Sequence, residues 1–326
     1  MIPLFYLAKP KYGGWVSFTS HLYRSLQAIK CQPKLFKITK TNEKKGRHFA
    51  DNIFYQNITV ETALNLSEQF NCLITAQDKN FTKQTDLLLR KNTKIVIHDP
   101  NEMKDNFIDI IKKNNIQPVV IRESNYQNLK KLNIKSTYIK HPYLPFNNNK
   151  QIKNKLAVAT SRIDFDKHTD LIIKANNLLN EKITIYGAEN RLYTYNKLNK
   201  IDPNWRDNYK GVFDNKLGSV FKILNPSKFM LDMSAIKKDG GGSQYTFLEG
   251  WDANCIIILN KKWDLGKNNT MKHNYNCFYA ENEKEIVELL KSNNQYEDII
   301  ENSLKELKLF NGVNIASEYQ DVIKSK

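Results

Sequence analysis

The stretch Asp239-Gly240-Gly241-Gly242-Ser243-Gln244-Tyr245-Thr246-Phe247-Leu248-Glu249-Gly250-Trp251 joins three consecutive glycines to a helical pattern of apolar side chains. The spacing of its aromatic and leucine residues predicts a helix that begins just after the glycines. The apolar run 254–260 then predicts a buried parallel strand. Glycines before a helix let a ligand approach the backbone, and the free N–H groups there favour an anionic or hydroxyl-rich ligand. The stretch therefore indicates half of a nucleotide-binding α/β unit; a glycine-rich surface turn before an ordinary amphipathic helix is the alternative.

The length and charge of the chain indicate how many domains it has and which kinds of partner it can bind. Its 326 residues suggest two domains, and Lys+Arg 50 against Asp+Glu 34 give a net charge of +16. Such a charge attracts the phosphates of a sugar nucleotide, a nucleic acid or an anionic membrane surface. The abundance of Lys, Asn and Ile is also typical of an AT-rich genome, so codon bias is a second source of the positive charge.

The four cysteines are scattered, with no CxxC pair and no His at metal-ligand spacing, which predicts reduced thiols and no metal site. No apolar run approaches the ~18 residues that span a bilayer, and the apolar run 1–8 lacks the basic leader of a signal peptide. We therefore expect no transmembrane segment and a cytoplasmic location, in the host cytoplasm if the gene is viral.

Short β-branched runs alternate with helical patterns along the whole chain, which predicts parallel, doubly wound sheets. A polar segment at 145–155 separates two such series and is the best candidate for a linker. Residues 41–48 are expected to form a basic loop. The expected strands are 3–8, 35–39, 72–75, 94–97, 119–122, 137–139, 156–160, 183–186, 229–233 and 254–260.

Ligands of such sheets bind beyond the carboxyl ends of the strands. Gly13 and Gly14 follow the first expected strand, and His98 and Asp99 follow the strand 94–97. The first loop lacks the full G-x-G-x-x-G pattern, which argues against a dehydrogenase. Taken singly, His98 could equally be a turn residue next to Pro100.

Two α/β halves, each with a glycine loop, resemble the GT-B glycosyltransferases. Residues 159–172 (ATSRIDFDKHTDLI) and 183–187 (ITIYG) are similar to the strand, arginine, lysine and glycine series of the retaining, glycogen-synthase-like branch (glycosyltransferase group 1, family 4-like). Residues 240–258 resemble the donor-binding loop and acidic helix of that branch. The resemblance implies two Rossmann-like domains facing each other across a cleft: an acceptor-side domain 1–148, on which a C-terminal helix at 310–326 packs back, and a nucleotide-sugar domain 149–309.

The resemblance also implies a nucleotide diphosphate sugar, first of all a UDP-sugar, as co-substrate, with no other cofactor and no metal. Fixed cations aimed at the diphosphate stabilise its growing charge as the glycosidic bond breaks. Glu249 is implied to hold the ribose hydroxyls, and His98 and Asp99 are the expected catalytic residues, which orient or deprotonate the acceptor hydroxyl. The implied donor-binding set is Gly13, Gly14, Arg162, Lys167, Gly187, Gly240, Gly241, Gly242, Ser243, Gln244, Tyr245, Thr246 and Glu249.

One departure from the family pattern concerns the sugar. The family often carries a first glutamate eight positions before the second, and Gly241 stands at that position here. Contacts to the donor sugar must then come from backbone amides or from Ser243 and Gln244. Without the resemblance, Arg162 and Lys167 could be a solvated loop and Glu249 a charge on a helix surface.

A second resemblance concerns the acceptor. The run 244–249 and the His98-Asp99 pair are also similar to the T-even phage DNA α-glucosyltransferases, which modify hydroxymethylated cytosine in duplex DNA. We therefore expect transfer with retention to a hydroxymethylated pyrimidine, which would be flipped out of the helix, and a phosphate footprint at Lys9, Lys11, Lys44, Lys45 and Arg47. The alternatives are a glycosyltransferase of surface polysaccharide or lipid-linked glycan synthesis that touches a membrane peripherally, and a non-catalytic sugar- or nucleotide-binding protein of the same fold.

Overall fold

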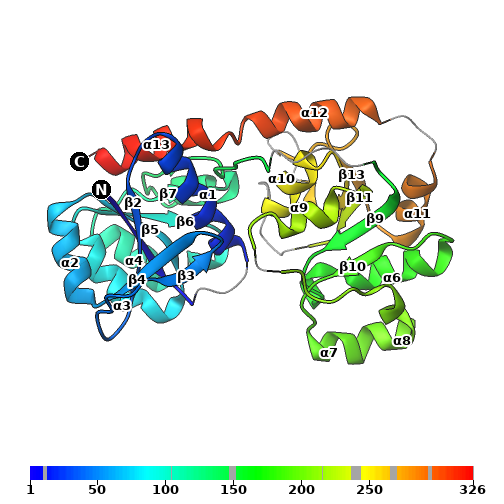
Figure 1. The fold of residues 1–326 in the computed structure, drawn as a ribbon, viewed down its shortest axis with the longest axis horizontal. Helices are drawn as coiled ribbons and strands as arrows, with labels where there is room; N and C mark the ends of the chain where they lie inside the picture. Colours follow the sequence, from blue (N-terminus) through cyan, green and yellow to red (C-terminus); the bar gives the residue numbers. More distant parts are fainter. Residues whose placement is uncertain are drawn as a thin grey trace. The chain divides into compact units, whose positions relative to one another are not determined.

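The protein, described here by a computed structural model, divides into two compact units (Figure 1). The first unit comprises Met1–Leu144 and Phe310–Lys326, and the second unit comprises Pro145–Leu309. The structure describes residues 1–9, 13–103, 105–146, 152–214, 216–235, 244–264, 270–292 and 296–325. The glycines at 240–242, Ser243 and Lys11 therefore lie outside the described residues.

The first unit is built on a sheet with the strand order β3-β4-β2-β1-β5-β6-β7-β8. All neighbouring strands are parallel except β3 and β4, which form an antiparallel pair. Because β2 and β5 lie on opposite sides of β1, the chain reverses its winding direction at β1, and the carboxyl ends of β1 and β5 mark a ligand crevice. The strands are β1 (Ile2–Leu7), β2 (Pro33–Ile38), β3 (Arg47–Ala50), β4 (Ile53–Ile58), β5 (Cys72–Gln77), β6 (Thr93–Ile97), β7 (Val119–Val120) and β8 (Thr137–Tyr138).

Helices cover both faces of this sheet. One apolar cluster, which includes Phe5, Ile74, Ile95 and Phe107, packs strand side chains against the helices. The C-terminal helix α13 packs on α1 within the same unit, as Figure 1 shows, and Asn311 caps its N-terminus. The helices are α1 (Gly14–Ala28), α2 (Val60–Gln69), α3 (Thr82–Leu89), α4 (Asp105–Lys113), α5 (Glu123–Lys131) and α13 (Gly312–Lys324), with short 3₁₀ turns η1 (Lys79–Phe81) and η2 (Pro100–Glu102).

The second unit contains a parallel sheet with the strand order β10-β9-β11-β12-β13. The winding direction reverses at β9, so its crevice lies at the carboxyl ends of β9 and β11. The strands are β9 (Lys155–Thr160), β10 (Thr184–Tyr186), β11 (Ser227–Asp232), β12 (Ile256–Asn260) and β13 (Phe278–Ala280). Strand β12 is buried throughout, as expected from its unbroken apolar sequence.

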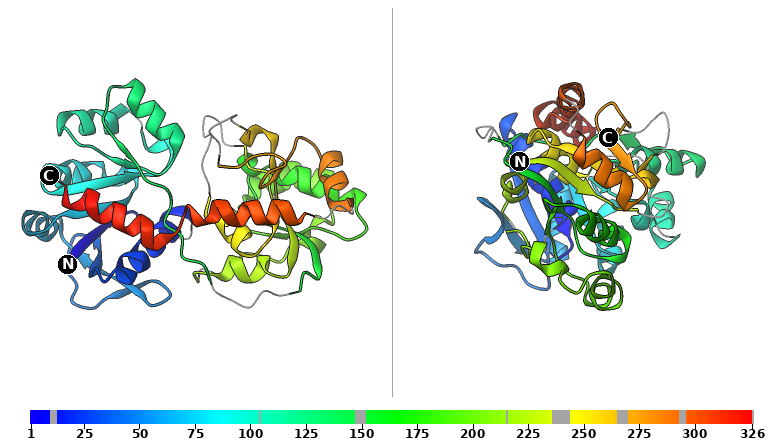
Figure 2. Two further views of the ribbon diagram at one scale, coloured as in Figure 1. Left: turned by 90° about the horizontal axis from the view of Figure 1, so that it is seen from above. Right: turned by 90° about the vertical axis from the view of Figure 1, so that its right-hand side faces the viewer.

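The helices of the second unit bury a separate apolar cluster that includes Phe229, Ile258 and Trp205. Helix α12 packs on α10 within this unit (Figure 2). The helices are α6 (Thr169–Leu178), α7 (Arg191–Tyr193), α8 (Asn199–Ile201), α9 (Ser219–Leu224), α10 (Tyr245–Asp252), α11 (Glu283–Lys291) and α12 (Glu297–Lys308). Shorter turns are η3 (Phe165–Lys167), η4 (a π-turn, Thr194–Leu198), η5 (Trp205–Asn208) and η6 (Lys261–Trp263).

The expectation of two doubly wound, mainly parallel sheets is confirmed. The expectation of a continuous loop at 41–48 is wrong, because Arg47 and His48 begin strand β3 and pair with β4. Both side chains are exposed on this edge strand, so the segment lacks the apolar alternation that would have identified it. None of the helices among the described residues combines the length and the apolarity that a bilayer crossing requires.

Candidate functional site

Three predicted donor-binding residues of the second unit lie just beyond the carboxyl ends of its parallel strands. Arg162 follows β9, Gly187 follows β10, and Lys167 lies in the turn η3 that links β9 to α6. The sheet topology thus brings together residues that are distant in sequence, at the edge where such sheets bind ligands.

Lys167 is buried, with 8% of its surface exposed, and its Nζ donates to Ser234 Oγ at 2.8 Å. Ser234 follows β11, and its hydroxyl in turn bonds to the buried Asp232 Oδ1. A buried ammonium group is stable only when it is hydrogen-bonded or paired. In the described part of the chain its Nζ has this single acceptor, which leaves two ammonium protons for an anion.

Arg162 is more exposed and lies in a small ion-pair network. Its guanidinium contacts Asp164 at 3.0 Å and Asp166 at 3.3 Å. The backbone carbonyl of Asp166 accepts from Ala235 N–H, which ties this loop to the segment after β11. The two carboxylates hold the arginine side chain in one orientation but also neutralise part of its charge.

Gly187 adopts φ 145°, a region that favours glycine. Its N–H donates to the carbonyl of Gly211, and its carbonyl accepts from Tyr209 Oη at 2.8 Å. The backbone of Gly187 packs directly against the backbone of Ser161, just after the end of β9. The glycine is therefore required by the packing of two strand ends, whatever ligand binds there.

Glu249 lies on α10 and is only 7% exposed, so the alternative of a charge on a helix surface is wrong. Burial, with a smaller contribution from Asp252, raises the pKa of Glu249 to about 8. Among the described residues no side chain donates a hydrogen bond to its carboxyl group. A buried carboxyl without a donor is costly unless a ligand supplies one.

The structure describes only some of the other predicted residues in the stretch 239–251. Tyr245 is buried at the start of α10, and Gln244 occupies the cap position before it without a side-chain capping bond. The Thr246 hydroxyl is buried, with no hydrogen-bond partner among the described residues. The predicted helix after the glycines is thus confirmed, whereas the glycine loop lies outside the described residues.

A hollow of about 440 Å³ opens beside this edge of the second unit. It is lined by His168, Leu171, Asn260, Lys261, Lys262 and Glu281. None of the predicted donor-binding residues that the structure describes is among these lining residues.

In the first unit, His98 lies at the carboxyl end of β6 and is 6% exposed. Its Nε2 is 2.7 Å from the carbonyl oxygen of Thr75, which can only accept, so we assign the ring proton to Nε2. Burial lowers the pKa of His98 to about 4, opposed by the bond to Thr75. The neutral ring therefore keeps its lone pair at Nδ1, where it can accept a hydrogen bond. The Phe18 ring packs edge-on against the His98 ring, with 4.7 Å between the ring centroids.

Asp99 caps the turn η2, and its Oδ1 accepts from Asn101 N–H at 2.7 Å. Gly13 caps α1 at φ 128°, and a Cβ on Gly13 or Gly14 would meet no described atom within 4 Å. With respect to the described residues, the space around both glycines is thus open. The predicted glycine and histidine loops lie on the same edge of the first sheet, where β1, β5 and β6 end.

Sequence reasoning missed Glu102, which joins these two loops. Its Oε1 accepts from Trp15 Nε1–H at 2.8 Å, and its Oε2 accepts from the His98 backbone N–H at 2.8 Å. No pattern identifies Glu102, because Trp15 is 87 positions away in sequence. Ser234 and Asp232 were missed for the same reason.

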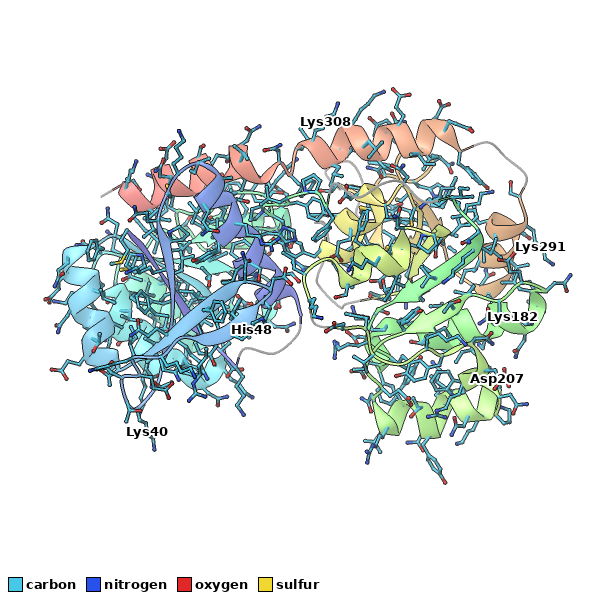
Figure 3. The ribbon with its side chains drawn as sticks, viewed as in Figure 1. Lys40, His48, Lys182, Asp207, Lys291 and Lys308 are labelled. Carbon is cyan, nitrogen blue, oxygen red and sulfur yellow. The ribbon has the colours of Figure 1, made fainter. Side chains whose placement is uncertain are left out.

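The predicted acceptor residues of the first unit are exposed, apart from Lys11, which is not described. Arg47 forms an ion pair with Glu43, whereas Lys44 and Lys45 lie exposed in the loop before β3. Figure 3 shows Lys40, from the same loop, projecting away from the body of the unit. Lys37 on β2 was not predicted; burial, Arg47 and Lys9 lower its pKa. These three cations therefore lie near one another.

Metal ligation has no support in the part of the chain that the structure describes, where no group of three or more His, Cys, Asp or Glu side chains is placed to hold an ion. All four cysteines are free thiols, and three of them are buried.

Comparisons with known proteins give structural relatives only. No protein-family model and no curated sequence matches the chain. Anabaena Alr3699/HepE in complex with UDP and glucose superposes with a TM-score of 0.75 at 11% identity, covering 100% of both chains. The pneumococcal O-GlcNAc transferase GtfA in complex with UDP and GlcNAc gives 0.68 at 12% identity, covering 99% of this chain and 98% of that one.

A third similar structure is an α-glucosyltransferase in complex with UDP and a 13-mer DNA containing an HMU base. Its TM-score is 0.70 at 12% identity, with 99% of each chain covered. All three are GT-B glycosyltransferases that cover essentially the whole chain. At identities this low, the superpositions show the architecture alone, and both sheets of this chain match that architecture. The chain therefore has the GT-B fold.

Proposed function

We propose that this protein is a glycosyltransferase that uses a nucleotide diphosphate sugar, with a UDP-sugar as the first candidate. The observation that carries the proposal is the buried Lys167, whose ammonium group lies where the winding of the second sheet reverses. Its two available protons suit a diphosphate. UDP is bound in the similar structures of HepE, GtfA and the α-glucosyltransferase.

In the proposed donor site, Lys167 and Arg162 stabilise the charge that grows on the diphosphate as the sugar leaves. Glu249 accepts hydrogen bonds from the ribose hydroxyls. These hydroxyls are donors of the kind that no described side chain offers to its carboxyl group. Gly187 and the glycines 240–242 allow the backbone to approach the nucleotide and sugar, and Ser243, Gln244 and Thr246 supply hydroxyl and amide groups. We propose that this scheme needs no metal and proceeds with retention.

In the proposed acceptor site, the first unit supplies His98 and Asp99. The neutral His98 accepts a hydrogen bond at Nδ1, which suits orientation of an acceptor hydroxyl. Asp99 has one carboxylate oxygen engaged in capping a turn, so its second oxygen is the candidate proton acceptor.

For the acceptor itself we propose the hydroxymethyl group of a modified pyrimidine in duplex DNA. The proposed basic surface of the first unit comprises the exposed Lys9, Lys44 and Lys45 and the half-buried Lys37, whose charges suit phosphates. The similar α-glucosyltransferase is bound to DNA with an HMU base. A surface glycan or lipid-linked acceptor is the second candidate, since the similar GtfA is an O-GlcNAc transferase.

The test is a transfer assay with a panel of nucleotide sugars, with and without duplex DNA that contains hydroxymethyl-cytosine or hydroxymethyl-uracil. We expect modified DNA to accelerate donor turnover and to gain the mass of one sugar per modified base. Donor turnover that no DNA stimulates would overturn the DNA acceptor and favour a glycan. No turnover of any donor, with nucleotide binding intact, would indicate a binding protein.

A further inference from the structure

Glu102 joins two segments of the first unit that are distant in sequence. It accepts one hydrogen bond from the Trp15 indole and one from the His98 backbone, each at 2.8 Å and each with a different carboxyl oxygen. Trp15 lies in the first turn of α1, directly after Gly13 and Gly14. One side chain thus holds the glycine end of α1 against the start of the His98-Asp99 turn.

The surroundings of Glu102 make this link sensitive to its charge. Burial and the neighbouring Asp99 raise the pKa of Glu102 to about 8, while the two accepted bonds and Arg122 oppose that rise. His98, the other titratable neighbour, is neutral near pH 7 because burial lowers its pKa to about 4. Loss of the proton therefore converts Glu102 into a group that only accepts hydrogen bonds, which suits two N–H donors.

We propose that Glu102 is a positioning residue for the acceptor side of the enzyme, which fixes His98 and the start of α1 through its two carboxyl oxygens. It does not need to touch a substrate. The kinetic role rests on the proposed function, whereas the link itself can be measured without any reaction.

The indole N–H of Trp15 gives a direct readout. The chain has four tryptophans, and Trp205, Trp251 and Trp263 belong to the second unit, so Trp15 reports on the first unit alone. In the ¹H–¹⁵N spectrum of the full chain, Trp15→Phe assigns its resonance by removing it. We expect this resonance to titrate with a midpoint near pH 8, and to shift and lose its titration in Glu102→Gln. The Trp205 and Trp263 resonances serve as internal controls, whereas Trp251 lies on α10 two positions from Glu249, whose own pKa is about 8.

The kinetic arm separates positioning from a merely structural role. Glu102→Gln keeps the shape but places an amide NH₂ against one of two N–H donors, so one bond is lost. Above pH 8, where Glu102 is ionised, we expect kcat/KM for duplex DNA that contains hydroxymethyl-cytosine to fall about tenfold, with UDP affinity within about twofold of the wild type. Trp15→Phe, which removes the other donor, should lower kcat/KM by a similar factor, and the double variant should add little.

The two proposals fail in different ways. A Trp15 resonance that neither titrates nor shifts in Glu102→Gln would overturn the link, even if the wild type transfers sugar. Unchanged acceptor kcat/KM in Glu102→Gln would overturn the positioning role. A normal Trp15 titration in a protein that turns over no donor would overturn the proposed function, and with it the role of Glu102 in acceptor positioning.

Discussion

A Cβ added to Gly187 would lie 1.8 Å from the carbonyl oxygen of Ser161, so the end of β10 closes against the end of β9 only because residue 187 is glycine. Gly187 also has φ 145°. Backbone atoms cannot move aside as a flexible side chain can, and the strands at this point form the edge that carries Arg162 and Lys167.

Gly187→Ala should therefore destabilise the second unit and displace the donor site. Gly211→Ala is the matched control, because Gly211 has φ 85° but its Cβ would meet no described atom within 4 Å. The control should lose about 1–2 kcal/mol from backbone strain alone, and Gly187→Ala should lose clearly more. Chemical denaturation of both variants measures the difference, and equal losses would show that the contact with Ser161 is unimportant.

Lys167→Met should weaken UDP binding by about 10- to 100-fold, the range expected for loss of charge-assisted hydrogen bonds. The fold should survive, because Ser234 keeps its bond to Asp232 and a buried charge is removed. Lys200→Met, at an exposed position in the same unit, is the control and should bind UDP normally. Titration calorimetry would contradict the assignment if both variants bound UDP equally well.

Glu249 should make the stability of the second unit depend on pH. Its folded-state pKa of about 8 lies above the value near 4.5 of an exposed carboxyl, so its stabilising contribution is fully present below pH 4.5 and is lost as pH rises through about 8. Relative to Glu249→Gln, the wild type should lose about 1.4 kcal/mol of unfolding free energy per pH unit across this window.

Denaturation followed by tryptophan fluorescence at about pH 5, 6.5 and 8 measures that slope, since three of the four tryptophans lie in the second unit. The exposed Glu281→Gln is the control and should show no such difference. Parallel pH profiles for the wild type and Glu249→Gln would mean that Glu249 titrates like an exposed carboxyl. UDP affinity of the wild type should also rise towards pH 8, because ribose hydroxyls bind the ionised carboxylate best.

The basic surface of the first unit should give duplex DNA binding a steep salt dependence. The double substitution Lys44→Ser and Lys45→Ser should weaken binding for every sequence tested. It should reduce the slope of log K against log salt by about 0.9 for each phosphate that these two lysines neutralise in the wild type. Lys284→Ser with Lys308→Ser, at exposed positions of the second unit, serves as the charge-matched control. Identical slopes for the two double variants would remove Lys44 and Lys45 from the DNA footprint.

The sequence predicted the sheets well because their central strands are continuous apolar runs, as in β5 and β12, whose burial on both faces leaves little ambiguity. It failed at the edge pair β3 and β4, where exposed residues such as His48 and Phe54 interrupt the pattern. Edge strands are half solvated, so hydropathy alone does not identify them.

Predicting the candidate site was harder, because its residues are linked by contacts between distant positions. The burial of Lys167 beside Ser234, 67 positions away in sequence, depends on the neighbouring packing of β9 and β11. The link from Trp15 to Glu102 depends likewise on where β1 and β6 end. Local patterns predict which strand end carries a residue, whereas hydrogen-bond partners across the sheet edge require the fold.

The most direct measurement is titration calorimetry of the full chain with UDP, compared with Lys167→Met and Glu249→Gln. Above pH 8, where Glu249 is ionised, a donor site at these residues predicts one UDP bound per chain, with affinity at least about tenfold weaker in each variant and a normal fold in both. If UDP and other nucleoside diphosphates give no binding, or bind equally well to the wild type and both variants, the second unit does not carry the nucleotide-sugar site proposed here.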